Sequence, residues 1–175
     1  MLVVILSIFG IIIAAILLAA LVMPKAYTIS SSTVINRSQA EVFDFVKHLR
    51  NQEQYSKWVM ADPNVQLTYT GTDGTVGFKA AWVSEDKNVG VGEQEITSII
   101  EGKRYDVEIR FEKPMKGISQ AHTTTEGIAE NQTKVTTVFE TETPFPFNVM
   151  VPLIKKMLQK DLDLNGATLK GVLEK

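Results

Sequence analysis

The first 24 residues constrain the fold more than any other feature of this sequence. Residues 1–24, MLVVILSIFGIIIAAILLAALVMP, contain no charged side chain, and Ser7 carries their only hydroxyl group. As an α-helix, residues 1–23 would be about 34 Å long, and the hydrocarbon core of a bilayer is about 30 Å thick. We therefore expect residues 1–24 to form a transmembrane anchor and residues 25–175 to form a separate domain.

Two other interpretations of this segment are possible. A cleaved secretory signal has a basic start, an apolar stretch of about 7 to 15 residues and a cleavage site between small residues. Here the basic start is missing, the apolar run is longer, and LVMPKAY fits such a site poorly. A helix in the core of a soluble protein is the other alternative, but a run that is apolar on every face suits lipid better.

The basic residues near this segment indicate its orientation. Lys25 and Arg37 follow the apolar run and no basic side chain precedes it. Cytoplasmic flanks of membrane helices are enriched in Lys and Arg. We expect a single-pass membrane protein whose domain lies on the cytoplasmic side.

Composition excludes several classes of function. The formal net charge is -2, the isoelectric point is near 5.7, and no basic run is present, so nucleic acid is not an expected partner. The chain has no cysteine, which removes thiolate metal sites and cysteine nucleophiles. No metal-ligand or phosphate-binding motif occurs, and we expect neither a metal nor a cofactor. The sequence points to no particular protein partner.

The pattern of residues 25–175 predicts a mixed α+β domain. Ser38 and Glu41 form a capping box, and Val42, Phe45, Val46 and Leu49 place one apolar stripe on the helix that follows it. A second short helix or turn is expected over 52–58. Alternation or β-branched composition predicts seven strands; these cover 26–36, 65–72, 75–85, 89–100, 104–112, 118–130 and 134–143.

The strand over 104–112 has the clearest alternation. Its apolar side chains, led by Tyr105, Val107 and Phe111, point one way and its charged side chains point the other, so one face of the sheet is dry and one is wet. After Pro152, a stripe of Leu158, Leu162, Asn165, Leu169 and Val172 predicts a long final helix. Gly166 and Gly171 weaken that helix, and either close packing or simple tolerance explains them equally well.

The resulting order, β-α-α-β6-α, together with VFDFVKHLRNQEQYSKWVMADPNVQLTYTG, VGFKAAW, GEQEITSIIEGKRYDVEIRFEKPMKG, TKVTTVFE and TPFPFNVM, resembles the START-like or SRPBCC superfamily. In particular it is similar to the bacterial polyketide cyclase/dehydrase-like members. The resemblance implies a helix-grip fold, in which a curved antiparallel seven-stranded sheet surrounds the C-terminal helix and leaves a hydrophobic cavity. A membrane segment is not part of that family pattern.

This architecture leads to a binding hypothesis. We expect a hydrophobic small molecule or lipid to be bound between the sheet and the final helix, with the membrane as a second partner. The expected lining residues are Trp58, Phe78, Trp82, Tyr105, Val107, Phe111, Met157, Leu158 and Leu162. The same side chains could instead fill a solid core, since periodicity does not distinguish the two.

Two alternatives remain open for the function. One is a cyclase, dehydratase or hydrolase that uses the same cavity, and His122 is its one candidate catalytic residue, provided that it faces inward. Ala121 and Thr123 would then face outward, because neighbouring residues of a strand alternate. The other is an interaction module without catalysis. The sequence contains no recognisable nucleophile motif, and this favours binding over catalysis.

Overall fold

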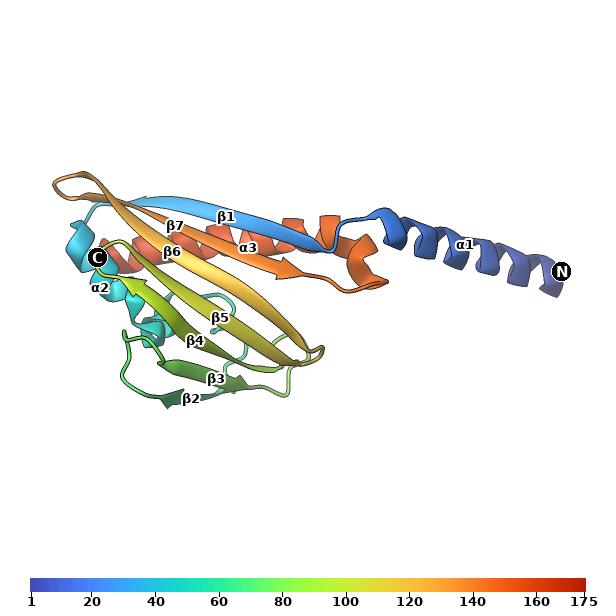
Figure 1. The fold of residues 1–175 in the computed structure, drawn as a ribbon, viewed down its shortest axis with the longest axis horizontal. Coiled ribbons are helices and arrows are strands. Elements are labelled where there is room, and N and C mark those ends of the chain that lie inside the picture. The colour runs from blue at the N-terminus through green and yellow to red at the C-terminus, as the bar shows by residue number, and fades with distance from the viewer.

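An antiparallel sheet of seven strands curls around the last helix of the chain (Figure 1). This computed structural model describes all residues 1–175, and the order of strands across the sheet is β1-β7-β6-β5-β4-β3-β2. The strands are β1 (Ala26–Ile35), β2 (Gln66–Thr70), β3 (Lys79–Val83), β4 (Val91–Ile100), β5 (Arg104–Lys113), β6 (Gly117–Ala129) and β7 (Gln132–Glu142). The predicted α+β helix-grip fold is confirmed.

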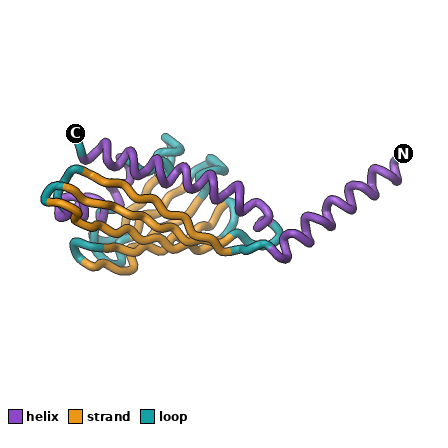
Figure 2. The backbone as a smooth tube through the Cα atoms, turned by 90° about the horizontal axis from the view of Figure 1, so that it is seen from above, coloured by secondary structure: helices purple, strands orange, loops and turns teal.

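The final helix, α3 (Val151–Leu173), lies along one face of the sheet, as Figure 2 shows from above. Leu162, Asn165 and Leu169 are buried on the side that faces the strands, which matches the predicted stripe. Its main neighbour in the sheet is β1. The first and last elements of the domain therefore pack against each other.

Gly166 allows the close approach of α3 to β1. A Cβ atom at Gly166 would lie 2.4 Å from Thr33 Oγ1, whereas a Cβ atom at Gly171 would meet nothing within 4 Å. Close packing therefore explains Gly166, and tolerance explains Gly171. The sequence alone leaves both explanations open for each glycine.

Two short helices follow β1 in the chain, and the first of them packs against β6 and β7. In α2 (Gln39–Lys47), Glu41 N donates to Ser38 Oγ and Ser38 N donates to the Glu41 carboxylate, so the predicted capping box is present. The buried phenylalanine of this helix is Phe43, whereas the predicted Phe45 is half-buried. The next element, η1 (Leu49–Gln54), is a 3-10 helix that begins before the expected range of 52–58.

Strand β3 is shorter than the alternation in the sequence predicts. The sequence predicts a strand over 75–85, but β3 begins at Lys79, after a turn that holds Gly74 and Gly77 at positive φ. Val76 lies in that turn and is 60% exposed, so it does not belong to the inward face. Positive φ suits glycine and ends the regular strand geometry there.

The N-terminal helix α1 (Leu2–Val22) points away from the domain (Figure 1). It is long and apolar enough to cross a membrane. Three residues separate it from β1. Asn148, a fully buried residue of η2 (Phe147–Met150), donates from Nδ2 to Ala20 O at 2.7 Å and to Met23 O at 2.8 Å. These bonds satisfy carbonyl groups that the helix end leaves free and join α1 to the domain.

The outer face of the sheet carries a network of charges around Arg110. Its guanidinium contacts the carboxylates of Glu93, Glu95 and Glu108 on β4 and β5, and Lys79 lies 3.4 Å from Glu95. The hydrogen bond from Arg110 is the main cause that lowers the pKa of Glu95. The wet face predicted for β5 is therefore confirmed.

This network predicts how stability depends on pH. A carboxyl group whose pKa is lowered in the folded state stabilises the fold above its unfolded pKa, about 4.3 for Glu, and that stabilisation is lost as the pH falls through the folded pKa. In Arg110→Met, three carboxylates repel each other at pH 7, and protonation relieves the repulsion. We expect this variant to be less stable than the natural chain at pH 7, and the difference to shrink near pH 3.5 in thermal unfolding followed by circular dichroism.

Lys87→Met is the matched control, because Lys87 is exposed and takes part in no ion pair. Its effect on the unfolding temperature should be small and nearly the same at both pH values. A stability loss in Arg110→Met that does not change with pH would show that the carboxylates are not coupled to this side chain.

Candidate functional site

A cavity with two adjoining compartments lies between the sheet, α3 and residues 49–65. The inner compartment has a volume of about 110 Å³ and the outer one about 270 Å³. Six residues line both compartments: Gln52, Ser56, Trp58, Gln94, Ile109 and Phe139. The interior is therefore not a solid core, and the compartments meet at this shared boundary.

The outer compartment is mostly apolar. Aromatic residues form much of its wall, and Trp82 meets Phe111 edge to face with ring centroids 5.8 Å apart. The indole of Trp82 donates from Nε1 to Val89 O at 3.2 Å, which satisfies its polar atom and fixes the ring. Aliphatic side chains such as Leu67 and Leu158 complete the wall. Such a surface favours an apolar ligand group.

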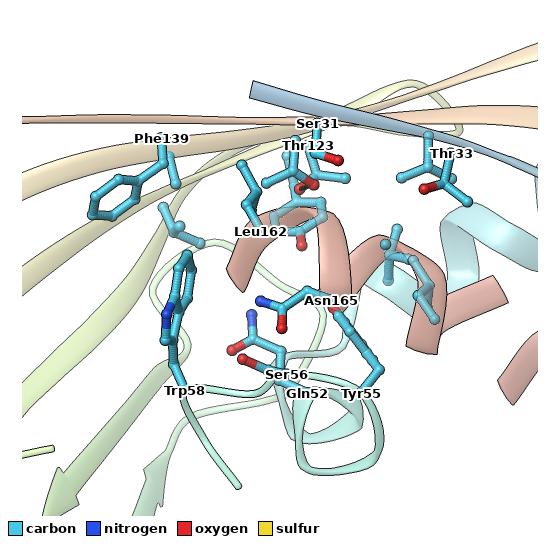
Figure 3. Close-up of a pocket in the computed structure, with 18 of the residues that line it drawn as sticks. Ser31, Thr33, Gln52, Tyr55, Ser56, Trp58, Thr123, Phe139, Leu162 and Asn165 are labelled. Atoms are coloured by element: carbon cyan, nitrogen blue, oxygen red, sulfur yellow. Dashed lines mark hydrogen bonds between the residues drawn. The ribbon is translucent and has the colours of Figure 1, made fainter. Parts of the chain in front are cut away.

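The inner compartment is lined by hydroxyl and amide groups as well as apolar side chains (Figure 3). The polar lining residues are Ser31, Thr33, Gln52, Tyr55, Ser56, Gln94, Tyr105, Thr123, Thr137 and Asn165. Thr123 Oγ1 and Thr137 Oγ1 lie 3.1 Å apart, and Asn165 directs its amide into the cavity while its Oδ1 accepts from Lys57 N at 2.7 Å. These groups offer both donors and acceptors to a neutral polar group.

Two tyrosines of the inner compartment stay neutral at physiological pH. Tyr55 on the segment after η1 is 8% exposed, and Tyr105 on β5 is 4% exposed. Burial raises the pKa of the Tyr55 phenol well above its ordinary value, and burial is also the main cause that raises the pKa of Tyr105. Burial penalises the charged phenolate, so both groups act as neutral hydrogen-bonding groups.

Trp58 stands between the two compartments. Its ring packs against Phe139 with centroids 5.9 Å apart, and its Nε1 donates to Asp161 Oδ2 at 3.4 Å. Lys57 Nζ contacts the other Asp161 oxygen at 2.5 Å, which supplies the buried carboxylate with an opposite charge. On the other side of the boundary, Gln94 Nε2 donates to Gln52 Oε1 at 2.8 Å. The boundary is therefore held by side chains from four different parts of the chain.

Seven of the nine predicted lining residues line the cavity. Trp58 borders both compartments; Trp82, Phe111 and Leu158 line the outer one; Tyr105, Val107 and Leu162 line the inner one. Whether these residues touch a ligand stays a prediction. The two others lie elsewhere. Phe78 is 1% exposed and stacks behind Tyr69 in the packed core, and Met157 points to the outside of α3 with 56% of its surface exposed.

His122, the candidate catalytic residue, lies on the outer face of the sheet. Its neighbours Ala121 and Thr123 line the inner compartment, so the alternation of β6 turns His122 away from it. It pairs in register with Asp106, whose carboxylate contacts Arg104 on the charged face. A catalytic role for His122 required an inward-facing imidazole, and the structure contradicts this placement.

Sequence reasoning missed most of the polar lining. Gln52, Ser56 and Gln94 have no neighbouring motif that marks them, and they meet only because η1 crosses over β4. The residues of β1 and β7 offer a usable signal: Ser31, Thr33 and Thr137 occupy inward positions that alternate with apolar inward residues such as Ile29, Val135 and Phe139. A polar residue on a dry face needs a partner, and it marks a candidate site.

No side chain that lines either compartment carries a charge. No group of three or more His, Asp or Glu side chains in residues 1–175 is placed to hold a metal ion. An isolated buried charge is strongly unfavourable in such surroundings. The cavity is thus suited to an uncharged molecule that has an apolar part and a neutral polar group.

The outer compartment lies toward the end of the domain that carries α1. In the strand register, the start of β1 lies beside the end of β7, the end of β7 beside the start of β6, and the start of β6 beside the end of β5. The end of β5 lies beside the start of β4, which pairs with the end of β3. Phe111, Trp82 and Val89 are all at these strand ends. The inner compartment reaches toward Val135 and Leu169, which lie toward the opposite end.

Comparison with known proteins gives one family and many similar folds. The model of a family described as polyketide cyclase / dehydrase and lipid transport matches residues 26–174. No curated protein matches the sequence.

Three solved structures illustrate the likeness of fold. Norcoclaurine synthase from Thalictrum flavum, solved with dopamine and hydroxybenzaldehyde, is 13% identical, with 85% of this chain and 87% of that chain covered and a TM-score of 0.63. The protein TTHA0849 from Thermus thermophilus is 13% identical over 85% and 97% of the chains, with a TM-score of 0.62. Protein CV1439 from Chromobacterium violaceum has the same identity and coverage and a TM-score of 0.60. At these identities the likeness concerns the fold.

Proposed function

Because the chain belongs to the polyketide cyclase / dehydrase and lipid transport family, we propose that it binds an uncharged hydrophobic molecule, such as a neutral lipid, in its two-part cavity. The observation that carries the proposal is the lining: an apolar outer compartment, an inner compartment rich in hydroxyl and amide groups, and no charged side chain in either. Binding sites for small molecules combine apolar walls with a few polar groups in this way.

The two compartments suggest how the ligand is oriented. A hydroxyl or carbonyl group would lie in the inner compartment, within reach of Tyr105, Thr123 or Asn165, and the apolar chain would fill the outer compartment beside Trp82 and Phe111. Lipids expose their polar groups at the bilayer surface. A lipid that enters from the bilayer would therefore leave it with the polar group first and the chain last.

We further propose that residues 1–24 anchor the protein in a membrane and that residues 25–175 form the binding domain. The apolar composition of α1 supports the anchor, and the family match over 26–174 supports the domain boundary. The cytoplasmic orientation follows from Lys25 and Arg37 and stays a prediction. The anchor would hold the outer compartment close to molecules that are dissolved in the bilayer.

A photoreactive long-chain alcohol with a diazirine in its chain tests the binding proposal. The full chain is placed in lipid nanodiscs with this probe or with the fatty acid of equal length, irradiated, and digested for peptide mass spectrometry. We expect the alcohol to label cavity peptides of β3, β5 and α3, which line the outer compartment where the chain would lie. The fatty acid should label them less, because the cavity offers its carboxylate no opposite charge.

The α1 peptides provide an internal control, since both probes should label them wherever α1 lies in lipid. Labelling of α1 without labelling of the cavity by the alcohol would refute the binding proposal and leave the anchor intact. Equal labelling of the cavity by both probes would refute the preference for an uncharged ligand.

A further inference from the structure

A strip of exposed apolar residues follows the start of α3 and the turn before it. Phe147, Met150, Leu153 and Met157 are spaced by three, three and four residues, so they share one face, and between 47% and 65% of each side chain is exposed. We call these four residues the apolar strip. Most exposed apolar side chains occur singly, and a continuous helical strip of them indicates a binding surface.

The position of the apolar strip is fixed relative to α1. Asn148 lies within the strip segment and bonds the carbonyl groups of Ala20 and Met23 at the end of α1. The 21 residues of α1 span about 32 Å as a helix, close to the thickness of a bilayer's hydrocarbon core. If α1 crosses a membrane, its end at Ala20 lies at the boundary between hydrocarbon and headgroups. Phe147 and Met150, on either side of Asn148, lie at the same depth.

The direction of α1 places the first turns of α3 near the membrane that α1 would enter. Figure 2 shows α1 leaving the domain obliquely, on the side of the sheet that α3 covers and away from the strands. The first turns of α3 therefore lie next to the plane that α1 enters. Met157, which does not line the cavity, belongs to this outward face, while its neighbour Leu158 lines the outer compartment.

The charges beside the strip fit an anionic lipid surface. Lys25, Lys155, Lys156 and Lys160 are exposed and none takes part in an ion pair within the protein. Helices that lie in the membrane interface combine an apolar face with flanking lysines, and anionic headgroups attract such lysines. Unpaired lysines close in sequence to an apolar strip favour a lipid surface over a protein of unknown charge.

From these observations we propose that the apolar strip docks on the bilayer surface, with the flanking lysines on anionic headgroups, and holds the domain in one orientation. The inference depends on the proposed anchor. Docking would bring the end of the domain that is next to α1 into contact with the membrane surface, and the outer compartment lies at this end. A ligand would then pass between bilayer and cavity without crossing open water.

Site-directed fluorescence in nanodiscs tests this docking, and the absence of natural cysteines makes single labels possible. Leu153→Cys reports on the strip, Ala14→Cys on the middle of α1, and Ile128→Cys on the far end of β6, where the side chain is 49% exposed. Each variant carries an environment-sensitive nitrobenzoxadiazole label. The discs contain phosphatidylcholine with phosphatidylglycerol, and lipids with a quencher near the headgroup or deep in the chain.

Docking predicts a blue-shifted emission at position 153 that headgroup-level quenchers reduce, and an emission at position 128 that no lipid quencher affects. Removing phosphatidylglycerol should weaken the quenching at 153. Deep quenchers should act at position 14. Equal, unquenched emission at 153 and 128, with position 14 quenched, would overturn docking and leave the anchor in place. Loss of quenching at 14 would refute the anchor itself.

Discussion

Substitution of Ala121 by phenylalanine is expected to reduce labelling of the cavity by the photoreactive alcohol at least tenfold. Ala121 lines the inner compartment, and in register it faces Val107 on β5 and Phe139 on β7, which line the same space. A phenyl ring there occupies volume that a ligand's polar group needs. Overpacking typically costs about 1–3 kcal/mol, and 1.4 kcal/mol corresponds to a factor of ten in affinity.

His122→Phe is the matched control for this experiment. It places a phenyl ring at the next position of the same strand, but on the outer face, and it also removes the imidazole of the enzyme hypothesis. Labelling of the cavity should stay near the natural level in this variant. Undiminished labelling in Ala121→Phe, with the protein folded by circular dichroism, would show that the inner compartment does not receive the ligand.

Substitution of Gly92 by alanine is expected to destabilise the domain by about 1–3 kcal/mol through overpacking. Gly92 is buried on β4, and a Cβ atom there would lie 2.6 Å from Arg110 O and 2.5 Å from a ring carbon of Trp82. Favourable contacts between carbon atoms lie near 3.5–4.0 Å, so either the β4–β5 pairing or the indole must move. Unfolding should occur at lower urea concentration, and Trp82 should change its fluorescence.

Gly117→Ala provides a close comparison. Gly92 and Gly117 both pair with Phe111, one from β4 and the other from β6, but a Cβ atom at Gly117 would meet nothing within 4 Å. Alanine restricts the unfolded chain, which adds about 0.4–1 kcal/mol of stability where the backbone permits it. We therefore expect Gly117→Ala to be at least as stable as the natural chain. Equal losses in the two variants would show that the contacts of Gly92 are not responsible.

The elements of this domain could be predicted because their signals are local. The alternation of β5 separates Tyr105 and Val107 from Asp106 and Glu108, and in the structure these two sets occupy opposite faces. The S-x-x-E pair at Ser38 and Glu41 fixed the start of α2 for a similar reason, since a capping box involves only four consecutive residues.

The candidate site was less predictable, because inward periodicity is the same for a packed residue and for a cavity wall. Phe78 and Tyr105 both point inward, yet Phe78 stacks against Tyr69 in the core, while Tyr105 borders the inner compartment. The sequence pattern predicts Met157 on the wrong face, because it directly precedes Leu158 and a helix of mixed composition allows a small error in the angle of its apolar stripe. The pairing of Gln52 with Gln94 has no trace in either local pattern.

By itself, the sequence determined the elements of this protein: an apolar segment long enough for a bilayer, strands with one dry face, and a final helix to cover them. It did so because hydrophobic periodicity and capping act over a few residues. Only the tertiary structure decided what the covered space contains. The gap between Trp58, Trp82 and α3 depends on how far a curled sheet stands from a helix, and the bonds of Asn148 that fix α1 join residues 125 or more positions apart.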